Sequence, residues 1–167
     1  MFSKKLEKAF NEQINAEIHS YYLYLSMSAW FSSKGYDGMA GWMKEQSQEE
    51  MTHAMKFYDY INERGGTVKL TTIEGPKTTF KSPLEIYKAA LAHEEYITGR
   101  INKLYKMAVA EEDFAAQSFL NWFVDEQVEE EATAQAVVDQ MMMVKDHPGG
   151  LFMMDRELGK RASGTGE

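Results

Sequence analysis

The sequence contains no cysteine, which excludes disulfides, thiolate metal sites and cysteine nucleophiles. Proline is scarce: three occur in 167 residues, at positions 76, 83 and 148, and this scarcity favours long helices. Basic residues are outnumbered by acidic ones, 18 to 26, and the net charge of −8 argues against a nucleic-acid partner, which would select a basic face. Long apolar runs are missing as well, since the uncharged stretch 20–33 is too short and too polar to span a bilayer.

Charged residues also stand at the very start of the chain, where a signal peptide needs an apolar segment. We therefore expect a cytoplasmic protein with no membrane partner. The apolar fraction of 44% is ordinary for a globular chain, and the length suits one domain with a substantial core. This domain is expected to cover residues 1–161, and the polar residues 162–167 are expected to form a disordered tail.

Capping signals divide the chain into four long helices and a short fifth one. Ser3, Ser82 and Asp113 each stand where a helix N-cap is expected, and Gly65-Gly66 suits a helix C-terminus. The expected helices are 4–31, 38–64, 83–111, 114–144 and, after a break at Pro148-Gly149-Gly150, 151–160. About seventeen residues link the second helix to the third, while the other long helices are joined by short loops. This spacing predicts an all-α four-helix bundle with one long crossover and a short fifth C-terminal helix.

Each long helix carries a glutamate near the middle of its apolar stripe. These residues are Glu17, Glu50, Glu94 and Glu130, and the bundle can bring them to one level. One such glutamate is most simply a boundary residue, but four buried together would repel one another unless cations or protons neutralised them. The segment 107–144 contains nine acidic residues and no Lys, Arg or His, so it supplies no neutralising partner.

His53 follows Glu50 by three residues, so a carboxylate and an imidazole lie on the same face of one helix. This spacing is weak evidence alone but strong evidence beside Glu17, Glu94 and Glu130 on three other helices. Oxygen-rich ligands with one nitrogen suit iron, manganese or zinc at a carboxylate-bridged pair of ions. Ferritin-like di-iron bundles are a known example of this arrangement.

The sequence resembles the prokaryotic non-haem ferritins over nearly its whole length, from residue 11 to residue 158. The most specific segments are Gln48-Glu49-Glu50-Met51-Thr52-His53-Ala54 and Glu126-Gln127-Val128-Glu129-Glu130-Glu131. The resemblance implies a ferritin-like bundle, iron storage, and ferroxidase activity in which Fe(II) is oxidised by dioxygen or peroxide. It also implies a homo-oligomer, a hollow shell of 24 subunits that holds Fe(III) mineral.

The resemblance also implies roles for individual residues. Glu17, Glu50 and His53 match the first iron site, and Glu50, as a bridge, matches the second together with Glu94 and Glu130. Two further residues match neighbours of this centre, namely Gln127 and Tyr24. The residues that match a third iron site of bacterial members are Glu49, Glu126, Glu129 and Glu130.

Related families fit the sequence less well. Bacterioferritins repeat the Glu-x-x-His motif on the fourth helix, where this chain has Gln127-x-x-Glu130. Haem is therefore not expected, although Met51 stands where bacterioferritins have their haem-ligating methionine. The DNA-coating mini-ferritins place their ligands differently and lack the fifth helix. Two other functions stay open: a di-iron oxygenase or peroxidase of the rubrerythrin kind, and a bundle whose glutamates are only structural.

Overall fold

The computed structural model describes residues 2–145 and 147–162. It contains five helices in this part of the chain and no strand, which confirms the predicted all-α class. The helices are α1 (Lys4–Ser33), α2 (Asp37–Glu63), α3 (Pro83–Ala110), α4 (Phe114–Val144) and α5 (Pro148–Ala162). Residues 163–167, which belong to the expected disordered tail, lie outside the described part of the chain.

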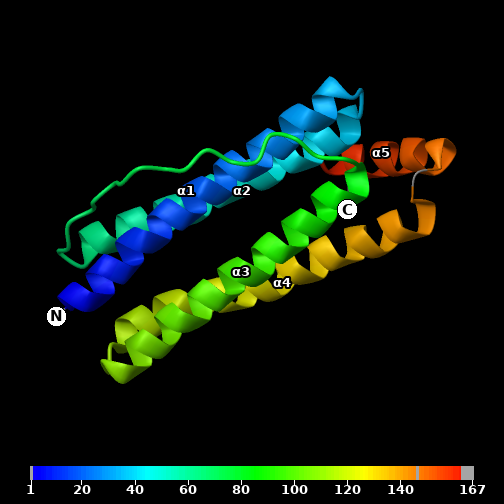
Figure 1. The fold of residues 1–167 in the computed structure, drawn as a ribbon. Helices are drawn as coiled ribbons and strands as arrows, with labels where there is room; N and C mark the ends of the chain where they lie inside the picture. Colours follow the sequence, from blue (N-terminus) through cyan, green and yellow to red (C-terminus); the bar gives the residue numbers. More distant parts are fainter. Residues whose placement is uncertain (1, 146, 163–167) are drawn as a thin grey trace.

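The four long helices form two antiparallel pairs, α1 with α2 and α3 with α4 (Figure 1). The connection between α2 and α3 runs along the outside of the first pair for the length of the bundle. This is the long crossover that the sequence predicts, and α5 lies across the end of the bundle that the crossover reaches. None of the described helices is long and apolar enough to cross a membrane.

The helix starts follow the predicted caps. Ser3 Oγ accepts a hydrogen bond from the Leu6 N–H at 3.1 Å, and Ser82 Oγ accepts one from the Glu85 N–H at 3.2 Å. Asp113 Oδ1 accepts from the Ala116 N–H at 2.9 Å at the start of α4. These contacts satisfy backbone donors that the first turn of a helix leaves free.

The fifth helix corrects one prediction. It spans Pro148–Ala162 and not 151–160, because Pro148, Gly149 and Gly150 form its first turn and do not break the chain. Proline is tolerated at the first helical position, since it lacks only an N–H that has no partner there. The Gly150 N–H donates to His147 Nδ1 at 3.2 Å, so His147 caps this turn.

Helix α5 packs tightly against the start of α2. A Cβ atom on Gly38 would lie 1.7 Å from the Asp155 carbonyl oxygen, so only glycine permits this approach. The Asp155 side chain accepts a hydrogen bond from the Met39 N–H at 2.9 Å. The contact fixes α5 against the bundle.

The apolar core forms two clusters along the bundle axis. One contains Tyr24, Met43 and the buried face of α5, and the other contains Phe10 and Phe57. On every long helix the predicted glutamate lies between the residues of one cluster and those of the other. The fold therefore places a polar level between two apolar ends.

Candidate metal centre

The four long helices each contribute one buried glutamate to this polar level. Glu17, Glu50, Glu94 and Glu130 are 1%, 1%, 2% and 8% exposed, and His53 is 4% exposed. Such burial is rare for carboxylates unless they are paired or bind a metal.

Glu17, Glu50 and His53 form one group of candidate ligands. Each offers an atom within 4.8 Å of the atoms that the other two offer. His53 Nδ1 lies 3.5 Å from Glu50 Oε2, as the three-residue spacing predicts. Among the described residues, Glu17 Oε2 and Glu50 Oε1 are buried and receive no hydrogen bond from another side chain or the backbone, although a protonated Glu17 can donate to Glu50. Unsatisfied buried oxygens are costly, and a bound cation would satisfy them.

A second group shares the same histidine. His53, Glu126 and Glu130 also offer ligand atoms within 4.8 Å of one another, and His53 Nε2 lies 3.8 Å from Glu126 Oε1. The Glu126 side chain is 28% exposed, so this group opens toward solvent. The structure therefore brings Glu126 to the histidine, whereas the resemblance implied only an oxygen site for it.

Glu94 lies on α3 and is held by two donors. The Tyr24 hydroxyl donates a short hydrogen bond to Glu94 Oε1, and the Gln127 amide donates to Glu94 Oε2 at 3.2 Å. Both Tyr24 and Gln127 are buried, as expected of residues that border the centre. Their hydrogen bonds account for both Glu94 oxygens. Among the described residues, Glu94 lies too far from the other candidate ligands to join either group.

Burial changes the protonation of the whole level. Burial, with the charge of Glu50 adding to it, raises the pKa of Glu17 to about 8. Burial and the charge of Glu94 raise the pKa of Glu130 to about 7. The pKa of Glu50 and that of Glu94 are raised as well, again chiefly by burial. Glu17 therefore holds a proton at neutral pH, and a divalent cation would have to displace it.

The remaining predicted ligands of the third site lie apart. Glu49 is half-buried and accepts from Arg161 Nη2 at 2.6 Å, while Glu129 is exposed. Within the described residues, neither Glu49 nor Glu129 joins a group of candidate metal ligands.

Two buried glutamines were not among the predicted site residues. Gln13 is 0% exposed and its Nε2 donates to Glu17 Oε1 at 2.8 Å. Gln46 is 1% exposed and its Nε2 donates to Glu130 Oε2 at 2.7 Å. Each glutamine lies four residues before a predicted ligand of its own helix, so the helical period carried a signal for both.

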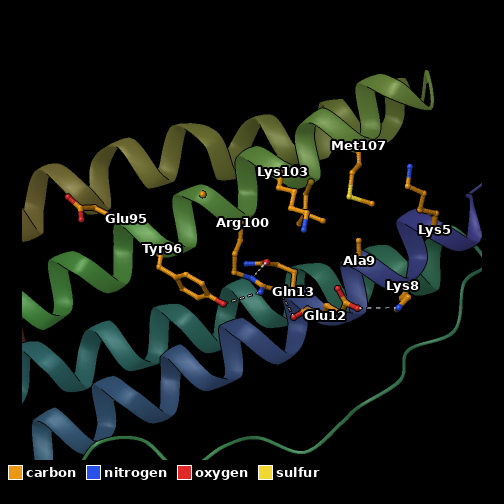
Figure 2. A pocket seen from close by; sticks show the side chains of 12 residues that line it. Lys5, Lys8, Ala9, Glu12, Gln13, Glu95, Tyr96, Arg100, Lys103 and Met107 are labelled. Atoms are coloured by element: carbon orange, nitrogen blue, oxygen red, sulfur yellow. Dashed lines mark hydrogen bonds and ion pairs between the residues drawn. The ribbon is translucent and has the colours of Figure 1, made fainter.

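A groove of about 790 Å³ lies between α1 and α3 (Figure 2). Basic side chains of Lys5, Lys8, Arg100 and Lys103 line it, and none of the predicted metal ligands does. The groove therefore contains none of the predicted ligands, but Gln13, which lines it beside Arg100, donates to Glu17.

An antiparallel four-helix bundle with a crossover and a buried carboxylate–histidine level is typical of the metal-binding helical bundles. Residues 7–144 match the family described as the Ferritin-like domain. The chain therefore belongs to the ferritin family.

Curated relatives agree with this assignment. The bacterial non-heme ferritin of Bacteroides fragilis (strain 638R) is 48% identical over 161 residues, which cover 96% of this chain and 100% of the relative. The protein of the same name from Staphylococcus epidermidis (strain ATCC 35984) is 43% identical over 162 residues, or 97% of this chain and 98% of the relative. These similarities confirm the predicted resemblance to prokaryotic non-haem ferritins.

A solved structure agrees as well. The open pore ferritin of Archaeoglobus fulgidus superimposes with a TM-score of 0.94 at 46% identity, covering 95% of this chain and 98% of that one. Membership of the family supports iron storage as the broad function of the chain and iron as the metal that it binds.

Proposed function

We propose that the chain is a ferroxidase that oxidises Fe(II) at the buried level of the bundle and stores the Fe(III) product as mineral. The observation that carries this proposal is the convergence of four buried glutamates from four helices with His53. Glu17 and Glu50 each keep a buried oxygen that no other described group pairs, and a shared proton satisfies them only while Glu17 is protonated. Once both are ionised, iron as substrate provides the partner that these oxygens need.

Two Fe(II) ions would be held by different parts of the centre. Glu17, Glu50 and His53, which already lie together, would bind the first ion. Glu50 would bridge to a second ion bound by Glu94 and Glu130, which requires Glu94 to exchange one of its present hydrogen bonds for the metal.

Two bound ions suit dioxygen because together they can supply two electrons. Two Fe(II) give up two electrons, and dioxygen takes these and two protons to become hydrogen peroxide. Carboxylate ligands favour Fe(III) over Fe(II), so the level promotes this oxidation. Metal binding would displace protons from Glu17 and Glu130, close to where dioxygen takes protons up.

Glu49, Glu126 and Glu129, with Glu130, are proposed to hold a third iron on the solvent side of the centre. Glu126 supports this role, because its half-buried side chain links His53 to the surface. Oxygen ligands without a thiolate would hold the ion weakly enough for release.

The mineral is proposed to collect inside a cytoplasmic shell of 24 copies. Large apolar side chains remain exposed near the α4–α5 end: Met143, Phe152 and Met153 are 83%, 61% and 69% exposed. Exposed apolar side chains of this size are typical of surfaces that contact another protein chain. Their position supports assembly of identical subunits.

Aerobic addition of Fe(II), followed by absorbance and by particle sizing, tests the proposal. Retention of hundreds of irons in a large particle is expected. Oxidation without retention would favour an oxygenase, and no oxidation would favour a structural bundle. Glu50→Ala should abolish the rapid phase in stopped-flow measurements, whereas Glu45→Ala, an exposed glutamate of the same helix, should leave it unchanged.

The third site needs a separate measurement. Glu49→Ala and Glu126→Ala should preserve the first fast oxidation and change later turnovers. Crystals soaked anaerobically in Fe(II) should show a third anomalous peak beside the first two. Two peaks, with unchanged later turnovers in both variants, would restrict the function to the dinuclear centre.

A further inference from the structure

We propose that two arginines outside the metal centre, Arg100 and Arg161, are positioning residues that orient Glu17 and Glu130 through buried glutamines. Each arginine fixes one glutamine amide, and that amide holds one oxygen of the glutamate. The other carboxylate oxygen is then left for the metal. This inference rests on the proposed function, because the orientation matters only if these glutamates bind iron.

The first arrangement joins α3 to α1 at the groove between them (Figure 2). Arg100 Nε donates to Gln13 Oε1 at 2.9 Å, and Nη2 donates to the Glu12 carbonyl oxygen at 3.0 Å. Gln13 then donates from Nε2 to Glu17 Oε1 at 2.8 Å. Glu17 Oε2, the oxygen that remains, is buried and receives no hydrogen bond from the described residues, and Glu17 lies in one group with the candidate ligands Glu50 and His53.

The second arrangement joins α5 to α2 and, through Gln46, to α4. Arg161 Nη1 donates to Gln46 Oε1 at 3.0 Å, and its guanidinium lies 4.9 Å from the centre of the Trp42 ring. Gln46 then donates from Nε2 to Glu130 Oε2 at 2.7 Å. Arg161 also donates to Glu49 at 2.6 Å, so the same guanidinium holds a predicted ligand of the third site.

The chemistry of the amide explains why an arginine is needed. A glutamine side chain presents an acceptor on one side and a donor on the other, and rotation by half a turn exchanges them. Arginine has donors only, so the glutamine oxygen must face Arg100 or Arg161 and the NH₂ group must face the carboxylate. Without the arginine, the amide can present its oxygen to the carboxylate, which repels it and turns the glutamate away from the metal.

The neutral glutamine between each arginine and its glutamate also favours metal binding. A guanidinium in direct contact with Glu17 or Glu130 would compete with Fe(II) for the same oxygens and would repel the ion. Gln13 and Gln46 transmit the orientation and keep the positive charge one side chain away from the centre. Such outer hydrogen-bond partners typically change metal affinity by about 10–100-fold when they are removed.

Anaerobic titration of the assembled, metal-free protein with Co(II) tests the inference, since the visible spectrum of Co(II) reports its ligand geometry. Arg100→Met and Arg161→Met keep an apolar stem and lose the donors. Each should weaken Co(II) binding by about tenfold or more and alter its spectrum, Arg100→Met at the site of Glu17 and Arg161→Met at the site of Glu130. The lysine variants, which still offer only donors, should recover most of the affinity.

Two further variants separate orientation from charge and from packing. Gln46→Met should reproduce the effect of Arg161→Met while leaving the Arg161–Glu49 contact in place, and the double variant should be no worse than either single one. Arg156→Met removes the same charge from α5 at a residue that lies beside Phe152, and it should bind Co(II) like the parent. If an arginine variant does not fold, the corresponding glutamine variant, Gln13→Met or Gln46→Met, carries the test.

Two results would overturn the inference, and they are distinguishable. If the parent binds Co(II) in a manner that Glu50→Ala abolishes, while the arginine and glutamine variants bind it equally well, the arginines only tie helices together. A fall in melting temperature alone would then be their whole effect. If the parent binds no Co(II) at the centre, the inference and the proposed function fail together.

Discussion

The metal-free protein should lose stability as the pH rises from 5 to 8, because its buried carboxyls hold protons that the unfolded chain has released. The pKa of Glu17 rises from 4.5 to about 8 on folding, and that of Glu130 rises to about 7. Between these values the folded protein binds more protons than the unfolded chain, so the free energy of unfolding falls with increasing pH. The stabilisation that these protons give is complete below the pKa of the unfolded chain. It is lost as the pH rises through the pKa of the folded protein.

The size of the effect follows from one residue. A pKa difference of one unit corresponds to about 1.36 kcal/mol. For Glu17 alone, a pKa of 4.5 in the unfolded chain and about 8 in the folded protein gives a loss of roughly 3–4 kcal/mol between pH 5 and pH 8. This is a large part of the 5–15 kcal/mol typical of a folded domain.

Glu17→Gln isolates this contribution, because the amide keeps the shape of the protonated carboxyl and cannot ionise. Its oxygen can still accept from Gln13, as Glu17 Oε1 does now at 2.8 Å. Relative to the parent, the variant should gain about 3–4 kcal/mol of unfolding free energy between pH 5 and pH 8. Glu12→Gln, an exposed position on the same helix, should show no such gain.

Denaturant unfolding at the two pH values measures the difference. The protein should be stripped with a chelator and held at one concentration, because assembly adds to the apparent stability. Infrared spectroscopy gives an independent reading, since the carbonyl band of protonated carboxyls near neutral pH should shrink in Glu17→Gln. Parallel stability profiles of the parent and Glu17→Gln across this pH range would refute the reasoning.

Two further predictions concern the packing of α5 and the support of Glu94. Gly38→Ala would place a Cβ atom 1.7 Å from the Asp155 carbonyl, so α5 must shift, and we expect a loss of about 1–3 kcal/mol in denaturant unfolding; an unchanged midpoint would contradict this contact. Tyr24→Phe removes the hydroxyl that donates to Glu94 Oε1, so calorimetric titration with Zn(II) should show weaker binding without loss of the fold; equal affinity would show that the hydroxyl does not orient Glu94.

Much of this architecture was predictable because it follows from local patterns. The helix period places Glu17, Glu50 and Glu94 on core-facing stripes, and the caps at Ser3 and Ser82 fix two helix starts. Matching of each helix to its neighbours then brings the stripes to one level, so four glutamates on four helices could be expected to meet.

The parts that the sequence did not predict depend on side-chain contacts between different helices. Arg100 and Arg161 lie outside the apolar stripes, and only the packing of α3 against α1 and of α5 against α2 brings them to buried glutamines. Glu49 was expected as a ligand of a third iron site, and the same packing pairs it with Arg161. The start of α5 was missed for a local reason, since Pro148 opens a helix as readily as it ends one.

The glutamates lie between two apolar clusters, and this position explains how the bundle tolerates buried carboxyls that destabilise the folded state. Near one end, Phe57 and Phe123 pack with ring centres 4.4 Å apart, and at the other Phe31 and Tyr87 pack 5.6 Å apart. Each cluster contains residues of all four long helices, so each holds the bundle together without help from the carboxylates. Glu50→Ala is therefore expected to leave both clusters intact, because Glu50 belongs to neither of them. The bundle can keep these buried carboxyls, whose ionisation is costly, because its stability is supplied by the apolar clusters on either side of them.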